Sequence, residues 1–113
     1  MTASFASSHQ YPVVDDATVS LSVTIGQGAL GSTLVILDGD HLVAGTGVKN
    51  FSLGLGQDIR GKTLVVTSSM VAINALTSNT VSLTGGASAQ TWTEQHPASA
   101  GDNVVYVCVV DFI

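Results

Sequence analysis

Alternation of apolar and polar residues runs through most of this chain and predicts β-strands. Between residues 19 and 25 every second residue is apolar, and the residues between them are Ser20, Ser22 and Thr24. This pattern is typical of a strand with one buried and one solvated face. Residues 33–37 are apolar on both faces, which indicates an interior strand. The final strand, Asn103–Phe112, is also apolar on both sides. Further strands are expected at 42–44, 48–55, 62–74, 80–84 and 90–94. No stretch keeps a helical period, so the chain is predicted to be all-β.

The segments between these runs contain residues that favour turns. Asp38 and Gly39 separate two apolar runs, which predicts a tight hairpin turn with positive φ. Ser68 and Ser69 interrupt the longest run and predict a bulge or a bend between sheets. The polar residues 75–79 predict a crossing between strands. About eight strands result, arranged as a single-domain antiparallel β-sandwich of the Greek-key type.

One domain is expected, because 113 residues is close to the commonest domain size. Residues 1–16 lack periodicity and are predicted to be a flexible N-terminal arm or a segment that covers a sheet edge. The β-sandwich domain is then expected to span residues 17–113.

Charge is scarce, and this limits the possible partners. Charged residues make up 10% of the chain, the net charge is −5, and the only basic residues are Lys49, Arg60 and Lys62. Three cations cannot neutralise a run of phosphates, so nucleic acid and anionic membranes are not expected to bind. Few Lys or Glu residues are available to protect strand edges. The sequence therefore predicts a homo-oligomer or another protein partner.

Location is inferred from what the residues lack. Residues 1–11 contain no cationic and apolar segments of a signal peptide, and no apolar run approaches the length of a membrane-spanning helix. The single cysteine, Cys108, cannot form an internal disulfide. We therefore expect a reducing compartment, with the cytoplasm favoured and no membrane span.

Trp92 is the strongest candidate for ligand binding. It is the only tryptophan, and in a strand it can stack on a sugar ring while Gln90 and Glu94 supply hydrogen bonds. The competing interpretation places Trp92 in the hydrophobic core, and this interpretation is favoured. The possible ligand-binding residues are thus Trp92, Glu94 and Gln90.

Loop aspartates provide a second hypothesis, a calcium site, since hard cations bind carboxylate and carbonyl oxygens. Asp38 and Asp40 flank Gly39, although such residues are also typical of a plain hairpin turn. Four further aspartates fall in expected loops and could converge at one end of a sandwich, namely Asp15, Asp16, Asp58 and Asp102. The histidines, His9, His41 and His96, have no zinc-ligand spacing, so no metal or cofactor is assigned.

No pattern predicts an enzyme. No G-x-S-x-G motif supports a catalytic triad. Cys108 lies between Val107 and Val109, where a cysteine behaves as a small buried hydrophobe. A G-x-G-x-x-G match begins at Gly26 but is followed by an expected strand, whereas a dinucleotide site needs a helix there.

A resemblance covers about half of the chain, on residues that form turns and strands. These are Leu-Gly-Leu-Gly at 53–56, Gly-Lys-Thr-Leu at 61–64, Asn74, Thr-Ser-Asn at 77–79, Gly-Gly at 85–86 and Gly-Asp at 101–102. With them the chain resembles small uncharacterised bacterial β-sandwich proteins, immunoglobulin-like or C2-like. The resemblance implies the architecture and no active site.

Three functional hypotheses follow. The leading one is a non-enzymatic assembly or protein-interaction module. The alternatives are a carbohydrate-binding module that uses Trp92 and a calcium-dependent ligand-binding module that uses the loop aspartates.

Overall fold

The structure, a computed structural model, describes residues 2–113 and contains nine strands and one short helix. The elements are β1 (Thr2–Tyr11), β2 (Thr18–Gly26), β3 (Leu30–Leu37), β4 (Asp40–Gly45), β5 (Val48–Leu55), α1 (Gly56–Ile59), β6 (Thr63–Val71), β7 (Leu76–Thr84), β8 (Gln90–Pro97) and β9 (Asn103–Phe112).

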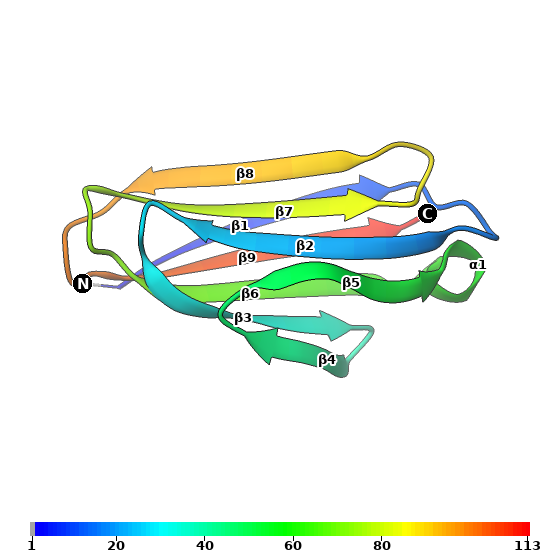
Figure 1. The fold of residues 1–113 in the computed structure, drawn as a ribbon, viewed down its shortest axis with the longest axis horizontal. Helices are drawn as coiled ribbons and strands as arrows, with labels where there is room; N and C mark the ends of the chain where they lie inside the picture. The colour runs from blue at the N-terminus through cyan, green and yellow to red at the C-terminus, as the bar shows by residue number, and fades with distance from the viewer. Residues whose placement is uncertain (1) are drawn as a thin grey trace.

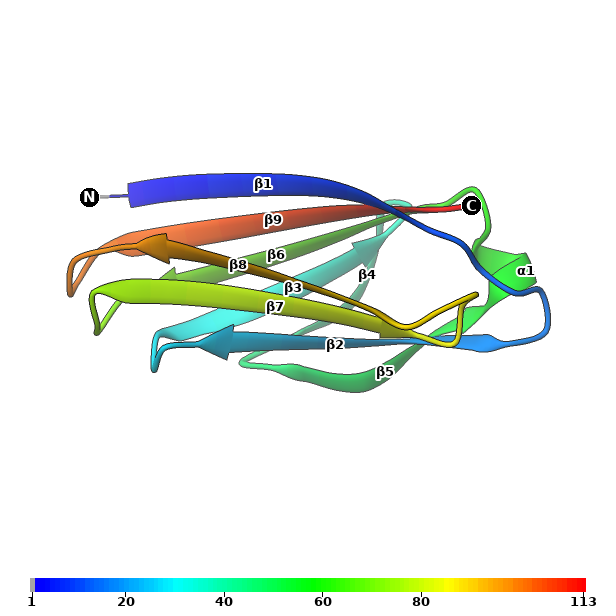
Figure 2. The same ribbon diagram turned by 90° about the horizontal axis from the view of Figure 1, so that it is seen from above.

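The strands form two sheets that pack face to face. A five-stranded sheet has the order β1-β9-β6-β3-β4, and a four-stranded sheet has the order β5-β2-β7-β8. Figure 1 shows the long molecule from one side, and Figure 2 shows the two layers from above. Consecutive strands share a sheet only at β3–β4 and β7–β8, while the other connections cross between the sheets. The predicted all-β sandwich is therefore confirmed.

The core lies between the two sheets and follows from the alternation in the sequence. Successive side chains of a strand point to opposite faces, so the apolar half of each strand reaches the interior. In β2 the buried residues are Val19, Leu21 and Val23, and in β9 five alternate residues from Val104 to Phe112 are buried. The residues between them lie on the outer faces of the sheets.

The predicted hairpin at Asp38 is confirmed. Leu37 pairs with Asp40, which leaves Asp38 and Gly39 as a two-residue turn with φ of 50° and 88°. Two consecutive positive φ angles are the requirement of the type I′ turn, which matches the twist of a hairpin.

The N-terminal boundary was predicted wrongly. Residues 2–11 are strand β1, which pairs in parallel with β9 from Thr2 to Tyr11. Ser7 and His9 occupy inward positions, so polar residues fall on both faces and the segment lacks the alternation of a strand. An edge strand tolerates this because it is solvated on its outer face and its open edge. The sandwich thus includes β1, and the antiparallel prediction fails for this one pair. The strand covers the edge of β9, as the second interpretation of residues 1–16 required.

Two expected interruptions are also corrected. The register of β6 continues through Ser68 and Ser69 against both β3 and β9, with no bulge or bend. The Ser68 hydroxyl shares a 3.0 Å hydrogen bond with the Thr33 hydroxyl, so a polar residue at an inward position is satisfied without a bulge. Residues 76–79, expected in a crossing, belong to β7, and Thr77, Ser78 and Asn79 are buried.

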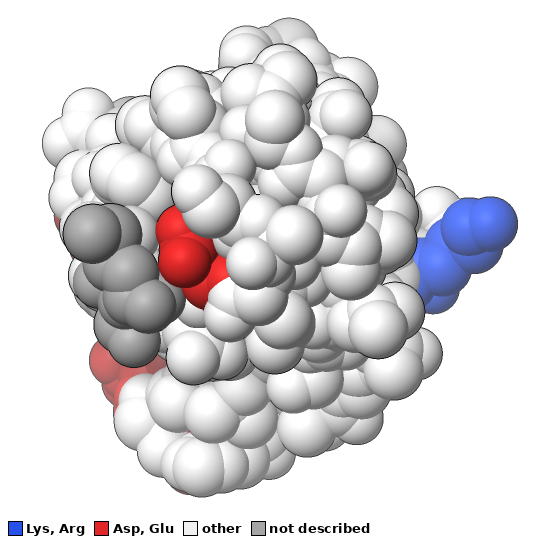
Figure 3. Space-filling model, turned by 90° about the vertical axis from the view of Figure 1, so that its left-hand side faces the viewer, with Lys and Arg blue, Asp and Glu red and all other residues white. Residues whose placement is uncertain are grey.

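Charged side chains are sparse on the surface, as the composition requires. Figure 3 shows one end of the molecule, on which most atoms belong to uncharged residues. Among residues 2–113 no helix is long and apolar enough to cross a membrane.

Candidate functional site

The edge strands β1 and β8 belong to different sheets and meet along one side of the sandwich. Two ring stacks join them: Phe5 lies 3.7 Å from His96, and His9 lies 4.3 Å from Trp92, centroid to centroid. We call this side the seam. Its inward-facing residues are Phe5, Ser7 and His9 of β1, Tyr106 and Cys108 of β9, Thr77, Asn79 and Val81 of β7, and Trp92, Glu94 and His96 of β8.

Strand register arranges the seam in layers. Asn79 pairs with Glu94 across β7 and β8, and Ser7 pairs with Cys108 across β1 and β9. These four side chains form what we call the middle layer. Because alternate residues of a strand share a face, the layers on either side contain the two ring stacks. A polar layer therefore lies between two aromatic ones.

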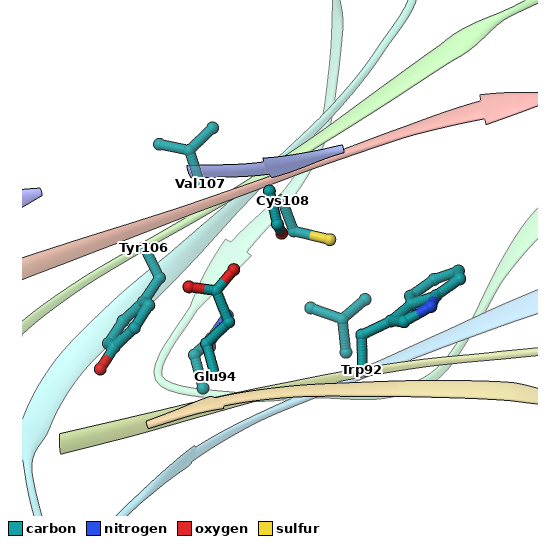
Figure 4. A pocket seen from close by; sticks show the side chains of 8 residues that line it. Trp92, Glu94, Tyr106, Val107 and Cys108 are labelled. Atoms are coloured by element: carbon teal, nitrogen blue, oxygen red, sulfur yellow. The ribbon is translucent and has the colours of Figure 1, made fainter. Parts of the chain in front are cut away.

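The middle layer encloses a cavity of about 10 Å³, which is about the space that one water molecule needs. Asn79 is only 4% exposed, and its Oδ1 atom has no hydrogen-bond partner. Figure 4 shows the Glu94 carboxylate between Tyr106 and Cys108, with Trp92 beside it. The cavity is thus lined by a carboxylate, an amide oxygen without a donor, and two aromatic rings.

Glu94 is partly shielded and lacks a strong cationic partner. Its side chain is 28% exposed, and its nearest ion-pair partner is His96, with 3.4 Å between Oε2 and Nε2. The other ion pair in the described part of the chain joins Arg60 to Asp15 at the α1 end. A shielded carboxylate retains much of its capacity to bind a cation or a hydrogen-bond donor.

Cys108 faces the same cavity as a neutral thiol. Burial raises the pKa of this thiol, a hydrogen bond with Ser7 opposes the shift in part, and the charge of Glu94 raises the pKa further. Since the thiolate is the nucleophile, Cys108 is unsuited to nucleophilic chemistry at neutral pH. Its expected burial in β9 is confirmed.

Tyr106 and Thr77 hold the neighbouring layer together. The Tyr106 hydroxyl donates to the Thr77 carbonyl oxygen at 3.0 Å and lies 2.8 Å from Thr77 Oγ1. Both residues are almost fully buried. This pair joins the two sheets by side-chain hydrogen bonds within the core.

The structure brings two of the three predicted ligand-binding residues together. Trp92 packs against the core, and the His9 ring is stacked on its indole ring. The Tyr11 ring meets the indole edge to face, with 6.4 Å between the ring centroids. Glu94 lies next to it on the inner face, whereas Gln90 is exposed at the start of β8 and donates to Ser88 Oγ at 3.1 Å. Sugar binding by Trp92 stays a prediction, and any sugar would have to approach beside His9.

Of the four aspartates expected to converge, three lie at one end of the sandwich and the fourth lies at the opposite end. Asp15 and Asp16 lie in the β1–β2 loop, which hydrogen-bonds to α1, the helix that contains Asp58. Asp102 lies in the β8–β9 loop at the opposite end, where its carboxylate accepts from the Ser99 amide. Within residues 2–113, no three His, Cys, Asp or Glu side chains are grouped to hold a metal ion.

The two outer faces of the sandwich differ in chemistry. On the four-stranded sheet, hydroxyls form ladders such as Thr80–Thr93 and Ser82–Thr91, each at 3.1 Å. On the five-stranded sheet, aliphatic side chains are neighbours across β9, β6 and β3. We call this surface the aliphatic face, and it comprises Leu30, Leu34, Ile36, Val65, Val71, Val105, Val107 and Val109.

One end of the aliphatic face carries a projection beside a depression. Leu30 is 68% exposed and Val71 is 39% exposed, and the two pair across β3 and β6. Next to them the small residues Gly31, Ser32 and Ser69 leave a depression of about 260 Å³.

Serine, threonine and asparagine at the seam were missed because hydrophobic alternation identifies buried faces only when they are apolar. The register of β7 and β9 would have been needed to find Asn79 and Tyr106 from the sequence.

No family model, no curated protein and no solved structure matches this chain.

Proposed function

We propose that this protein is a non-enzymatic assembly module that pairs with a second copy of itself through the aliphatic face. The observation that carries the proposal is the contiguous set of eight aliphatic side chains on an outer sheet face, where polar residues are the norm. Val107 and Val109 of β9 lie beside Thr67 and Val65 of β6, and these lie beside Leu34 and Ile36 of β3.

The size of the face fits a dimer. The outer face of the whole five-stranded sheet, with strands about 4.8 Å apart and about 27 Å long, covers on the order of 600 Å². The aliphatic face forms its three middle strands, on the order of 400 Å². Two copies packed over the whole sheet face would bury on the order of 1,200 Å², which is the lower limit of stable specific interfaces.

Charge and shape favour a second copy over an unrelated partner. The chain carries a net charge of −5, but the aliphatic face contains no charged residue, and Asp111 at its border is hydrogen-bonded to Thr63. Two copies can therefore approach there without repulsion between buried charges. Leu30 and the depression beside it lie on the same surface, so a two-fold axis lets each copy fill the depression of the other.

The test is the molar mass in solution. Size-exclusion chromatography with light scattering is expected to give twice the monomer mass of 11.5 kDa for the wild type at micromolar concentration. Leu30→Lys is expected to give a monomer, because it places a charge where the side chain would enter the depression of the other copy. Leu30 is mostly exposed, so the variant should keep its fold.

Thr24→Lys provides the matched control, since Thr24 is also exposed but lies on the four-stranded sheet. It should remain a dimer. A wild type that stays monomeric up to about 100 μM would refute the proposal, and so would a dimer that Leu30→Lys leaves intact.

A further inference from the structure

We propose that the middle layer of the seam binds the ammonium head of a small primary amine, a site separate from the aliphatic face. The layer consists of Ser7, Asn79, Glu94 and Cys108 around a cavity of about 10 Å³. Its polar groups, its size and its aromatic walls each point to this ligand class.

The polar groups call for a hydrogen-bond donor. Asn79 Oδ1 is buried and has no partner, and leaving a buried acceptor unpaired costs about 1–3 kcal/mol. Glu94 adds a carboxylate that accepts hydrogen bonds but, when ionised, cannot donate any. A guest with several N–H groups can bond to both residues at once.

Charge favours a cation over water. Glu94 is shielded on most of its surface, and its ion-pair partner among the described residues is His96, with 3.4 Å between Oε2 and Nε2. The protein around it is acidic and holds only three basic side chains. His96 is cationic only when protonated, so a permanently charged guest would give Glu94 a cationic partner that His96 supplies only in part.

Size and walls restrict the cation. The cavity has room for one water-sized group, which fits an ammonium head and excludes a guanidinium or a quaternary amine. Trp92 and Tyr106 both line it, and aromatic faces attract ammonium groups. The partial exposure of Glu94 leaves a route by which the organic part of the amine can extend into solvent.

The experiment uses the only tryptophan as a reporter, because Trp92 lines the cavity. Methylammonium chloride is titrated into the wild-type protein at constant ionic strength while tryptophan fluorescence is recorded. A saturable change is expected. Potassium has the same charge but no N–H donors, and tetramethylammonium has no N–H donors and is too large, so neither should produce the change.

Two variants locate the site. Glu94→Gln and Asn79→Leu are each expected to raise the midpoint of the methylammonium titration at least tenfold. Gln95→Leu is the matched control, since Gln95 neighbours Glu94 on β8 but is exposed on the opposite face, and it should leave the midpoint unchanged. Circular dichroism confirms that each variant is folded.

The wild-type titrations need no variant and can overturn the proposal alone. It fails if methylammonium produces no saturable change, or if potassium produces an equal one. It also fails if folded Glu94→Gln binds methylammonium as the wild type does.

Discussion

Replacing Trp92 by alanine is the most direct test of how the seam is closed. The indole spans the boundary between the core and the middle layer, and it contacts His9 face to face and Tyr11 edge to face. Alanine removes both contacts and opens a gap between β1 and β8, which no backbone hydrogen bonds join. The variant should therefore lose stability without losing the fold.

The magnitude follows from the buried surface and the ring contacts. An indole buries on the order of 150 Å² or more, and about 25 cal/mol per Å² of apolar surface gives nearly 4 kcal/mol. Each ring contact adds about 0.5–1.5 kcal/mol. Trp92 is partly exposed at a sheet edge, where neighbours can relax into the gap, so we expect a loss of about 3 kcal/mol, at the lower limit for a large buried aromatic.

Urea unfolding followed by far-ultraviolet circular dichroism measures this loss, because the signal does not depend on the tryptophan itself. Trp92→Phe is the matched control: it keeps a ring against His9 and should lose only about 1 kcal/mol. A loss below about 0.5 kcal/mol for Trp92→Ala would be a surface result and would refute the packing of the seam described here. If the alanine variant stays equally stable and instead loses binding on a glycan array, the carbohydrate hypothesis is supported.

Two further predictions concern buried polar groups. Thr33→Val leaves the Ser68 hydroxyl without its 3.0 Å partner and should lower the free energy of unfolding by about 1–3 kcal/mol. The double variant with Ser68→Ala should lose little more than the single variant. Urea unfolding measures both losses, and strictly additive losses would contradict the pairing. Burial raises the pKa of the Cys108 thiol in the folded state. Above the ordinary thiol pKa the folded state therefore binds more protons than the unfolded state. The free energy of unfolding should then fall as the pH rises. The difference in unfolding free energy between wild type and Cys108→Ala, measured from neutral to alkaline pH, should follow this slope; a pH-independent difference would contradict it.

The predictable part of the fold is the part where burial and apolarity coincide. The bounds of β5 and β9 match those expected, because each strand is apolar on its inner face and flanked by residues that favour turns. The Asp38–Gly39 turn was also predictable, since positive φ at consecutive positions restricts the choice of residue. The parallel pairing of β1 was not, because strand order depends on contacts between residues about 100 positions apart.

The aliphatic face illustrates a different limit. Alternation predicts which residues share a face, but Val65, Val107 and Leu34 become neighbours only through the order β9-β6-β3. The strand at residues 33–37, apolar on both faces, was interpreted as an interior strand, and β3 is interior to its sheet. The second apolar face nevertheless covers no part of this chain's own core. That surplus of aliphatic surface, exposed at Leu30 and Val71 and half-buried elsewhere, is the physical basis for expecting a second copy against it.

The seam shows why a site of this kind escapes detection from alternation. Thr77 and Asn79 occupy inward positions of β7, but both are polar residues, which alternation assigns to the solvent-facing side. The pattern therefore predicted a crossing at residues 75–79 and a strand that begins only at residue 80. A polar inner face is stable only if partners on the opposing sheet satisfy it, and Tyr106 does so for Thr77. Asn79 lacks such a partner for its Oδ1 atom. Of the two residues that broke the pattern, one is therefore explained by the fold alone, and the other calls for a donor from outside the chain.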